Sequence, residues 1–330
     1  DGFAIHRKVE MLLSADTPSG IAKSMGLGMI GFSDALEELA PDLLLVLGDR
    51  FEIMSCVAAA MVARVPVAHL QGGELSEGAI DEAIRHSITK MSQVHLVAAE
   101  DYRRRVIQLG EHPDTVHLVG GPSLDNIRRL EFLDRPALEE SLDFQFGPRN
   151  LLITFHPVTL ETATSATQME ELFAALAGLK ETHLIFTMPN ADSDGRIIKQ
   201  MIDKFVSNHK TRSISFTSMG HLNYLSTLQF VDGVIGNSSS GLAEVPTFKI
   251  GTINIGDRQK GRLKAKSIID CEPTKISIRK AIEILYAEDY QIILPAVENP
   301  YGEGKSTGKI MEILRKTNIP EETKKVFYDL

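Results

Sequence analysis

Tryptophan is absent from the 330-residue sequence, and only two cysteines occur, Cys56 and Cys271. Two cysteines so far apart favour free thiols in a reducing compartment over a disulfide framework or a zinc cluster. No apolar run approaches the roughly 20 residues that a membrane-spanning helix needs, and the N-terminus lacks the basic and apolar segments of a signal peptide. These absences predict a soluble, cytoplasmic protein without a membrane partner.

The sequence also lacks an excess of positive charge. It has 35 lysines and arginines against 44 acidic residues, which gives a net charge of −9. Nucleic-acid binding depends on clustered cationic surface, so the composition argues against a nucleic-acid partner. The basic run 103–105 is more typical of a solvated helix face than of an anion site.

The chain is long and 43% hydrophobic, which favours two domains over one. Short apolar runs rich in branched residues alternate with helical patterns, as expected of parallel strands buried on both faces. The predicted strands are 42–48, 65–70, 94–99, 115–121, 151–155, 182–188, 213–217, 233–237 and 251–256. A charged stretch at 131–149 contains two prolines and is interpreted as the linker.

This pattern predicts an α/β fold with two Rossmann-like domains whose parallel sheets face a cleft. The domains are expected at 1–135 and 150–305, and the helices expected at 308–330 could pack back on the first domain. The chain opens without the strand and glycine-rich turn that usually begin such a domain, so the first strand is expected to be missing.

Polar residues concentrate where the predicted strands end, which is where open parallel sheets bind ligands. The segment GNSSSGLAEV (236–245) follows one strand and is suited to a diphosphate, because backbone amides and hydroxyls at a helix start hold phosphate. A plain helix cap is the alternative. Glu244 is placed to accept hydrogen bonds from ribose hydroxyls. Arg258 fits either a phosphate or base contact or a surface ion pair.

The segment HLQGGELSEGAIDEAIRH (69–86) holds unusually many titratable groups. Glycines after a strand allow a ligand to approach the backbone while Glu74 points towards it. Asp49, from the neighbouring strand end, is predicted to form a carboxylate cluster with Glu74 and Asp81 that divides acid and base roles. Helix-stabilising pairs explain part of the pattern, and a divalent metal is a weaker alternative.

A histidine, His156, leaves another strand just before Pro157. It could hydrogen-bond a leaving phosphate or carry a proton, although a lone histidine at a strand end is more often structural.

Together, LGDRFE, GGELSEGAIDEAIRHSITKMS, GGPSLDNI, ITFHPVT, GNSSSGLAEV and INIGDRQKGR resemble, in order, the hydrolysing UDP-N-acetylglucosamine 2-epimerases of sialic acid biosynthesis. The resemblance spans about residues 1 to 315. It implies a glycosyltransferase-B type of fold, a nucleotide-sugar substrate, a homo-oligomer (dimer or tetramer), and neither metal nor cofactor. The implied reaction converts UDP-GlcNAc and water into UDP and N-acetylmannosamine through 2-acetamidoglucal.

By this resemblance the predicted catalytic residues are Asp49, Glu74, Asp81 and His156. The predicted substrate-binding residues are Arg50, Gln71, His86, Asn190, Asn237, Ser238, Ser239, Ser240, Gly241, Glu244 and Arg258. Which of the acids removes the C2 proton is left open.

Two features depart from the family pattern. Gln71 stands where animal-type members have a glutamate thought to act in catalysis, and an amide cannot remove a proton. The family's opening GTRADYG-like strand and turn has no counterpart. The alternatives are therefore a 2-epimerase for the 2,4-diacetamido-trideoxy (bacillosamine) nucleotide of legionaminic acid synthesis, a non-hydrolysing epimerase, a glycosyltransferase of the same fold, or a UDP-sugar-binding relic without turnover.

Overall fold

The computed structural model describes residues 4–13, 17–75, 80–156, 165–189, 195–317 and 323–330. The chain divides into two compact units. Unit 1 comprises Asp1–Pro122 and Lys305–Leu330, and unit 2 comprises Ser123–Gly304. No helix within the described ranges has the length and apolar character needed to cross a bilayer.

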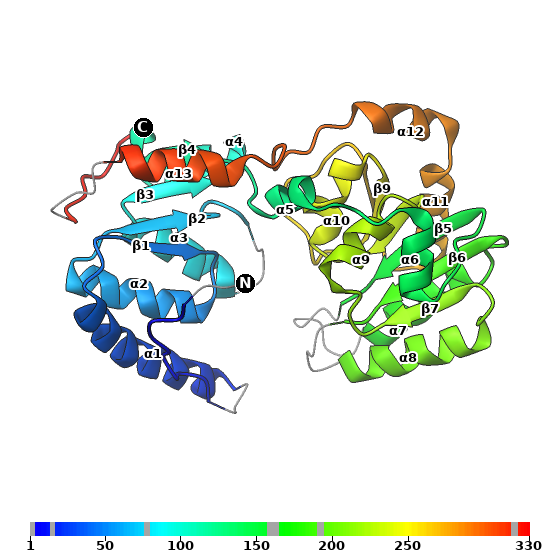
Figure 1. The fold of residues 1–330 in the computed structure, drawn as a ribbon, viewed down its shortest axis with the longest axis horizontal. Helices are drawn as coiled ribbons and strands as arrows, with labels where there is room; N and C mark the ends of the chain where they lie inside the picture. The colour runs from blue at the N-terminus through cyan, green and yellow to red at the C-terminus, as the bar shows by residue number, and fades with distance from the viewer. Residues whose placement is uncertain (1–3, 14–16, 76–79, 157–164, 190–194, 318–322) are drawn as a thin grey trace. The chain divides into compact units, whose positions relative to one another are not determined.

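Unit 1 contains a four-stranded parallel sheet in which neighbours in sequence are neighbours in space, in the order β1-β2-β3-β4 (Figure 1). Its strands are β1 (Leu44–Leu47), β2 (Val67–Leu70), β3 (Val94–Val97) and β4 (Val116–Leu118). Its helices are α1 (Pro18–Leu39), α2 (Phe51–Ala63), α3 (Ile80–Met91), α4 (Glu100–Gln108) and α13 (Ser306–Lys316), with a 3-10 turn η1 (Pro113–Thr115).

Helices cover both faces of this sheet, because alternate residues of β2 belong to different cores. Val67 packs with apolar residues of α1, α2 and α3. Ala68 and Leu70 pack instead with Ile310 of α13. In α3, Ile84 and Ile88 are buried, but Ile80 at its start is 61% exposed.

Unit 2 contains a six-stranded parallel sheet in the order β10-β9-β8-β5-β6-β7. Its strands are β5 (Arg149–Thr154), β6 (Thr182–Thr187), β7 (Ser213–Phe216), β8 (Gly233–Gly236), β9 (Gly251–Ile255) and β10 (Ile268–Cys271). Its helical segments are α5 (Ser123–Arg129), α6 (Arg135–Leu142), α7 (Ser165–Leu176), α8 (Gly195–Asn208), α9 (Gly220–Thr227), α10 (Ser240–Ala243), η2 (Val245–Phe248), α11 (Lys275–Leu285), α12 (Glu288–Ile293) and η3 (Leu294–Ala296).

The strand order of unit 2 is that of a Rossmann fold. In this fold the first strand lies at the centre of the sheet, and the order in which later strands are added reverses beside it. Here the reversal falls between β5 and β8, the two strands that pair at the centre of the sheet. One face is covered by α7, α8 and α11, which share a single apolar core with β5, β6, β8 and β9.

The nine strands predicted from the sequence are all present, and the predicted fold class is confirmed. The structure adds β10, an edge strand that is only partly buried and therefore lacks a marked apolar run. The charged stretch at 131–149 is not the simple linker that the sequence predicted. It contains α6, which Asp134 caps through the amide of Ala137, and it belongs to unit 2, whose first residue is Ser123.

Candidate functional site

In unit 2, the predicted residues gather where β5 and β8 end side by side. Thr154 and Gly236 are register partners, so His156 and Asn237 follow neighbouring strands at the reversal point of the sheet. The Asn237 side chain accepts from the His156 amide at 2.7 Å and donates to the His156 carbonyl at 2.8 Å. Buried Asn237 therefore fixes the backbone that carries His156.

The serine turn continues from Asn237 into α10, which is a single turn long and passes directly into the 3-10 turn η2. The sequence predicted that a helix starts here and could hold a diphosphate, with a plain helix cap as the alternative. Pro246 near the start of η2 limits that helix, because proline cannot continue the amide hydrogen-bond ladder. Ser239 precedes α10, is exposed, and makes no side-chain capping bond.

Ser240 and Glu244 are joined by a hydrogen bond, with the Ser240 hydroxyl donating to Glu244 Oε2 at 2.5 Å. The Tyr224 hydroxyl of α9 lies 2.7 Å from Ser240 Oγ. Burial raises the pKa of Tyr224 to about 12, so its proton is retained at neutral pH. Tyr224 was not predicted as a site residue, since its helix is distant in sequence from the serine turn.

Arg258 follows β9 and reaches the same turn, donating from Nη1 to the Asn237 carbonyl at 2.9 Å. The buried side chain of Gln259 donates to the same oxygen, also at 2.9 Å. Gln259 is a further residue that the sequence reasoning missed. Three strand ends, those of β5, β8 and β9, thus contribute to one polar cluster in unit 2.

In unit 1, Arg85 of α3 contacts two of the predicted acidic residues, Asp49 and Glu74. Its side chain is 4% exposed, forms an ion pair with the Asp49 carboxylate, and lies 3.6 Å from a Glu82 carboxylate oxygen. It also donates to the Glu74 carbonyl at 2.9 Å. Arg85 therefore joins the end of β1, through Asp49, to the turn after β2, through Glu74.

Asp81 lies near this pair. Burial raises the pKa of the Asp81 carboxyl, and the negative charge of Asp49 raises it further. The cations Arg50 and Arg85 act in the opposite direction. The charges of Asp49 and Asp81 therefore interact, whereas Glu74 contacts Arg85 through its backbone carbonyl, so the three-carboxylate cluster stays a prediction.

The glycine turn before Glu74 is tightly constrained. Gln71 has a left-handed backbone with φ of 63°, which is uncommon for a residue other than glycine. Gly73 has φ of 77°, and a Cβ there would lie 2.5 Å from the carbonyl oxygen of Tyr102. Arg105 donates to the Gly73 carbonyl. This packing buries Glu74, whose residue exposure is 8%.

A buried histidine of β2, His69, supports the Asp49 turn and was not predicted. Its Nε2 is 2.9 Å from the carbonyl oxygen of Gly48, and its Nδ1 is 3.3 Å from the Thr89 hydroxyl. Burial lowers the pKa of His69 to about 4, so the neutral ring donates to Gly48 and accepts from Thr89 at pH 7.

The remaining predicted residues divide into three cases. His86 forms the expected helix pair with Glu82, at 3.2 Å. Arg50 is exposed and lies 3.5 Å from a Glu52 oxygen. Asn190 lies outside the described residues.

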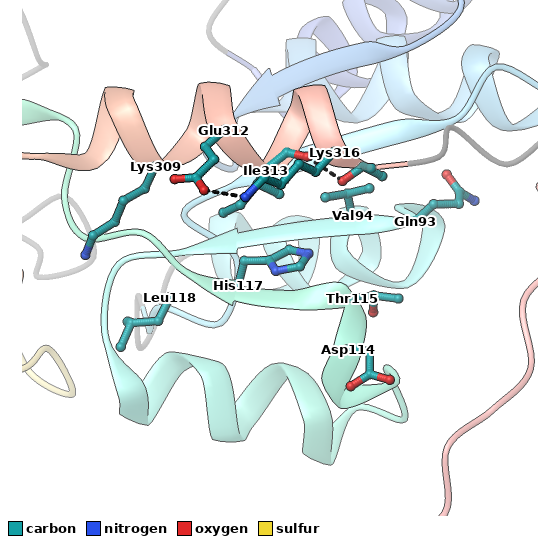
Figure 2. A pocket seen from close by; sticks show the side chains of 11 residues that line it. Gln93, Val94, Asp114, Thr115, His117, Leu118, Lys309, Glu312, Ile313 and Lys316 are labelled. Atoms are coloured by element: carbon teal, nitrogen blue, oxygen red, sulfur yellow. Dashed lines mark hydrogen bonds and ion pairs between the residues drawn. The ribbon is translucent and has the colours of Figure 1, made fainter.

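A pocket of about 640 Å³ lies elsewhere in unit 1, between the β3–β4 region and α13 (Figure 2). Its lining includes His117, Lys309 and Lys316 and none of the predicted site residues. Gln93 and Thr115 line it just before β3 and β4 begin, at the opposite ends of these strands from the acids.

Two parallel α/β units, each carrying polar residues at the carboxyl ends of its strands, define a protein with two Rossmann-like domains. A family model described as UDP-N-acetylglucosamine 2-epimerase matches residues 1–315. The chain belongs to this family.

Two relatives are similar in sequence to this chain over nearly its whole length. A GDP/UDP-N,N′-diacetylbacillosamine 2-epimerase (hydrolyzing) from Campylobacter jejuni is 39% identical over 99% of this chain and 85% of its own length. Polysialic acid biosynthesis protein P7 from Escherichia coli is 37% identical over 100% and 84%. The crystal structure of UDP-GlcNAc 2-epimerase from Neisseria meningitidis bound to UDP-GlcNAc has a TM-score of 0.79 at 17% identity, covering 91% and 84%, which shows a common fold.

Proposed function

We propose that this chain is a hydrolysing 2-epimerase of UDP-linked 2-acetamido sugars. The observation that carries the proposal is the group formed by Asp49, Arg85 and Asp81 at the carboxyl edge of the unit 1 sheet, in a chain of the epimerase family. In this proposal unit 2 binds the nucleotide and unit 1 supplies the acid and base groups.

The reaction is an elimination followed by a hydration. The C1–O bond breaks with its electron pair leaving on UDP, the C2 proton passes to a carboxylate, and a C1–C2 double bond forms. Water then adds its oxygen to C1 and releases one proton to solvent, while an acid group on the opposite face from the base delivers a proton to C2. Departure of UDP makes C1 cationic, which acidifies the C2 proton, so the anionic group beside C1 and the base at C2 act together.

We assign the proton transfer at C2 to Asp81 and electrostatic stabilisation of C1 to Asp49. A carboxylate with a raised pKa is a stronger base, and both burial and Asp49 raise the pKa of Asp81. Asp49 forms an ion pair with the buried guanidinium of Arg85. Gln71 has no carboxylate to offer, so Asp81 takes the role that the family resemblance gives to an acid at position 71.

For the nucleotide we propose that Ser238, Ser239 and Arg258 hold the diphosphate and that His156 assists its departure. Ser239 is exposed without a capping role, and Arg258 reaches the same turn. Glu244 is assigned to the ribose hydroxyls.

For the sugar we propose N,N′-diacetylbacillosamine as the substrate class. The likeness to the Campylobacter jejuni enzyme and the amide at Gln71 both favour it over N-acetylglucosamine. UDP-GlcNAc is the second candidate, favoured by the description of the matching family and by the fold of the UDP-GlcNAc-bound Neisseria meningitidis enzyme.

The test is incubation of the protein with each nucleotide sugar, followed by analysis of free UDP and of the released 2-epimeric sugar. Turnover of the diacetyl nucleotide in preference to UDP-GlcNAc supports the proposal. An intact epimeric nucleotide sugar as the product, or transfer of the sugar to an acceptor, refutes hydrolysing epimerase activity.

Two variants separate the proposed roles. Asp49→Asn is expected to abolish UDP release while the UDP dissociation constant stays within about twofold of wild type, since unit 1 acts on the sugar. Ser239→Ala is expected to weaken UDP binding about three- to tenfold, the effect of losing one hydrogen bond. The opposite pattern would exclude this division between the units.

A further inference from the structure

The Ser240 hydroxyl contacts both Glu244 and Tyr224, and together these contacts fix the direction of its hydrogen bonds. A serine hydroxyl has one proton to donate, and a carboxylate only accepts. Ser240 donates its proton to Glu244 Oε2 at 2.5 Å. The contact of 2.7 Å with Tyr224 must therefore be a bond in which the tyrosine hydroxyl donates and Ser240 accepts.

We infer that Tyr224 is a positioning residue for ribose recognition, acting through Ser240 on the carboxylate of Glu244. The inference rests on the proposed function, in which Glu244 accepts hydrogen bonds from the ribose. It also reassigns Ser240, which was predicted to bind substrate. With its only proton committed to Glu244, Ser240 has none to donate to a diphosphate oxygen.

The placement of Glu244 explains why such support matters. Glu244 stands at the junction of α10 and η2, where a one-turn helix gives a side chain little support of its own. Tyr224 comes from α9, an eight-residue helix whose Leu225, Ser226 and Thr227 are buried. The relay thus ties the short turn to a well-packed helix.

Glu244 keeps enough capacity for a ligand. A carboxylate offers about four acceptor positions, and the bond from Ser240 uses one of them. Two vicinal ribose hydroxyls can donate to those that remain. A carboxylate with a fixed orientation loses less conformational freedom when it binds, which increases affinity.

The experiment measures calorimetric dissociation constants for UDP and for 2′,3′-dideoxy-UDP, which lacks both ribose hydroxyls. Wild type is expected to bind UDP at least about tenfold more tightly, the usual effect of a hydrogen bond to a charged group. Tyr224→Phe and Ser240→Ala are expected to reduce this preference about three- to tenfold, with less than twofold change for 2′,3′-dideoxy-UDP.

A matched control is Tyr286→Phe, the same substitution at a tyrosine whose hydroxyl donates to Asp232 at 3.3 Å. Asp232 precedes β8 at the opposite end from the serine turn, so the preference for UDP should be unchanged. Inorganic pyrophosphate gives a second readout, because its affinity should be unchanged in Ser240→Ala.

The outcomes separate the two proposals. Wild type that fails to bind UDP overturns the proposed function and the relay together. Wild type that binds UDP, with Tyr224→Phe retaining the full preference or weakening both nucleotides equally, overturns only the relay. Weaker pyrophosphate binding by Ser240→Ala would return Ser240 to the diphosphate.

Discussion

Replacing Arg85 with methionine should destabilise unit 1 substantially, because it removes the cation that holds the ends of β1 and β2. The Arg85 side chain is 4% exposed and its partner Asp49 is 20% exposed, so water screens the pair poorly. Removing one partner of such a buried pair costs about 3–5 kcal/mol. The Glu74 carbonyl also loses a donor at 2.9 Å, and we take this loss as included in that range.

The assay is thermal and urea unfolding at pH 7. For a chain of this size the expected loss lowers the melting temperature by on the order of 10 °C. The double variant Arg85→Met/Asp49→Asn should be less destabilised than the sum of the single variants by about 0.5–3 kcal/mol, because neither charge is then left alone.

Arg104→Met is the matched control. Arg104 pairs with Asp101 in the same unit, but the two side chains are 69% and 42% exposed, and such pairs contribute about 0–1 kcal/mol. If Arg85→Met shifted the melting temperature no more than Arg104→Met does, the structural role given to Arg85 would be wrong.

Three further predictions concern titratable groups. His69→Phe removes the bond to the Gly48 carbonyl and should lower kcat on the order of 100-fold with little change in UDP affinity, as measured by kinetics and calorimetry. The ionised form of Asp81 is the base, so kcat should fall as the pH drops through the raised pKa of Asp81. Arg50 lowers this pKa, so Arg50→Gln should move the acid limb of the kcat–pH profile to higher pH. Burial alone would raise the pKa of Glu111, but hydrogen bonds from a histidine and two lysines lower it to about 2. The ionised carboxylate therefore stabilises the fold above pH 4.5, and this effect is lost as the pH falls towards 2. Glu111→Gln should lower the free energy of unfolding by about 3 kcal/mol at pH 7 and by far less near pH 2, as measured by unfolding experiments.

Much of the fold could be predicted because it is encoded locally. Parallel strands buried on both faces appear as short apolar runs, and polar residues after each run mark the edge of the sheet where ligands bind. The strand ends at Asp49, Glu74, His156 and Asn237 were found in this way. The edge strand β10 was missed because it is only partly buried and carries no marked apolar run.

The partners of these residues could not be predicted, since they depend on which segments meet in three dimensions. Arg85 lies one helical turn from Glu82, yet it also forms an ion pair with Asp49, 36 residues away. Tyr224 and Ser240 are 16 residues apart on different helices.

The sequence by itself determined the strands, the positions of their polar ends and the family of the chain, because these depend on residue type and spacing. Tertiary structure alone decided which carboxylate the buried arginine neutralises and where the single proton of Ser240 points. Those choices depend on distances between segments and on the exclusion of water, which one-dimensional spacing does not contain.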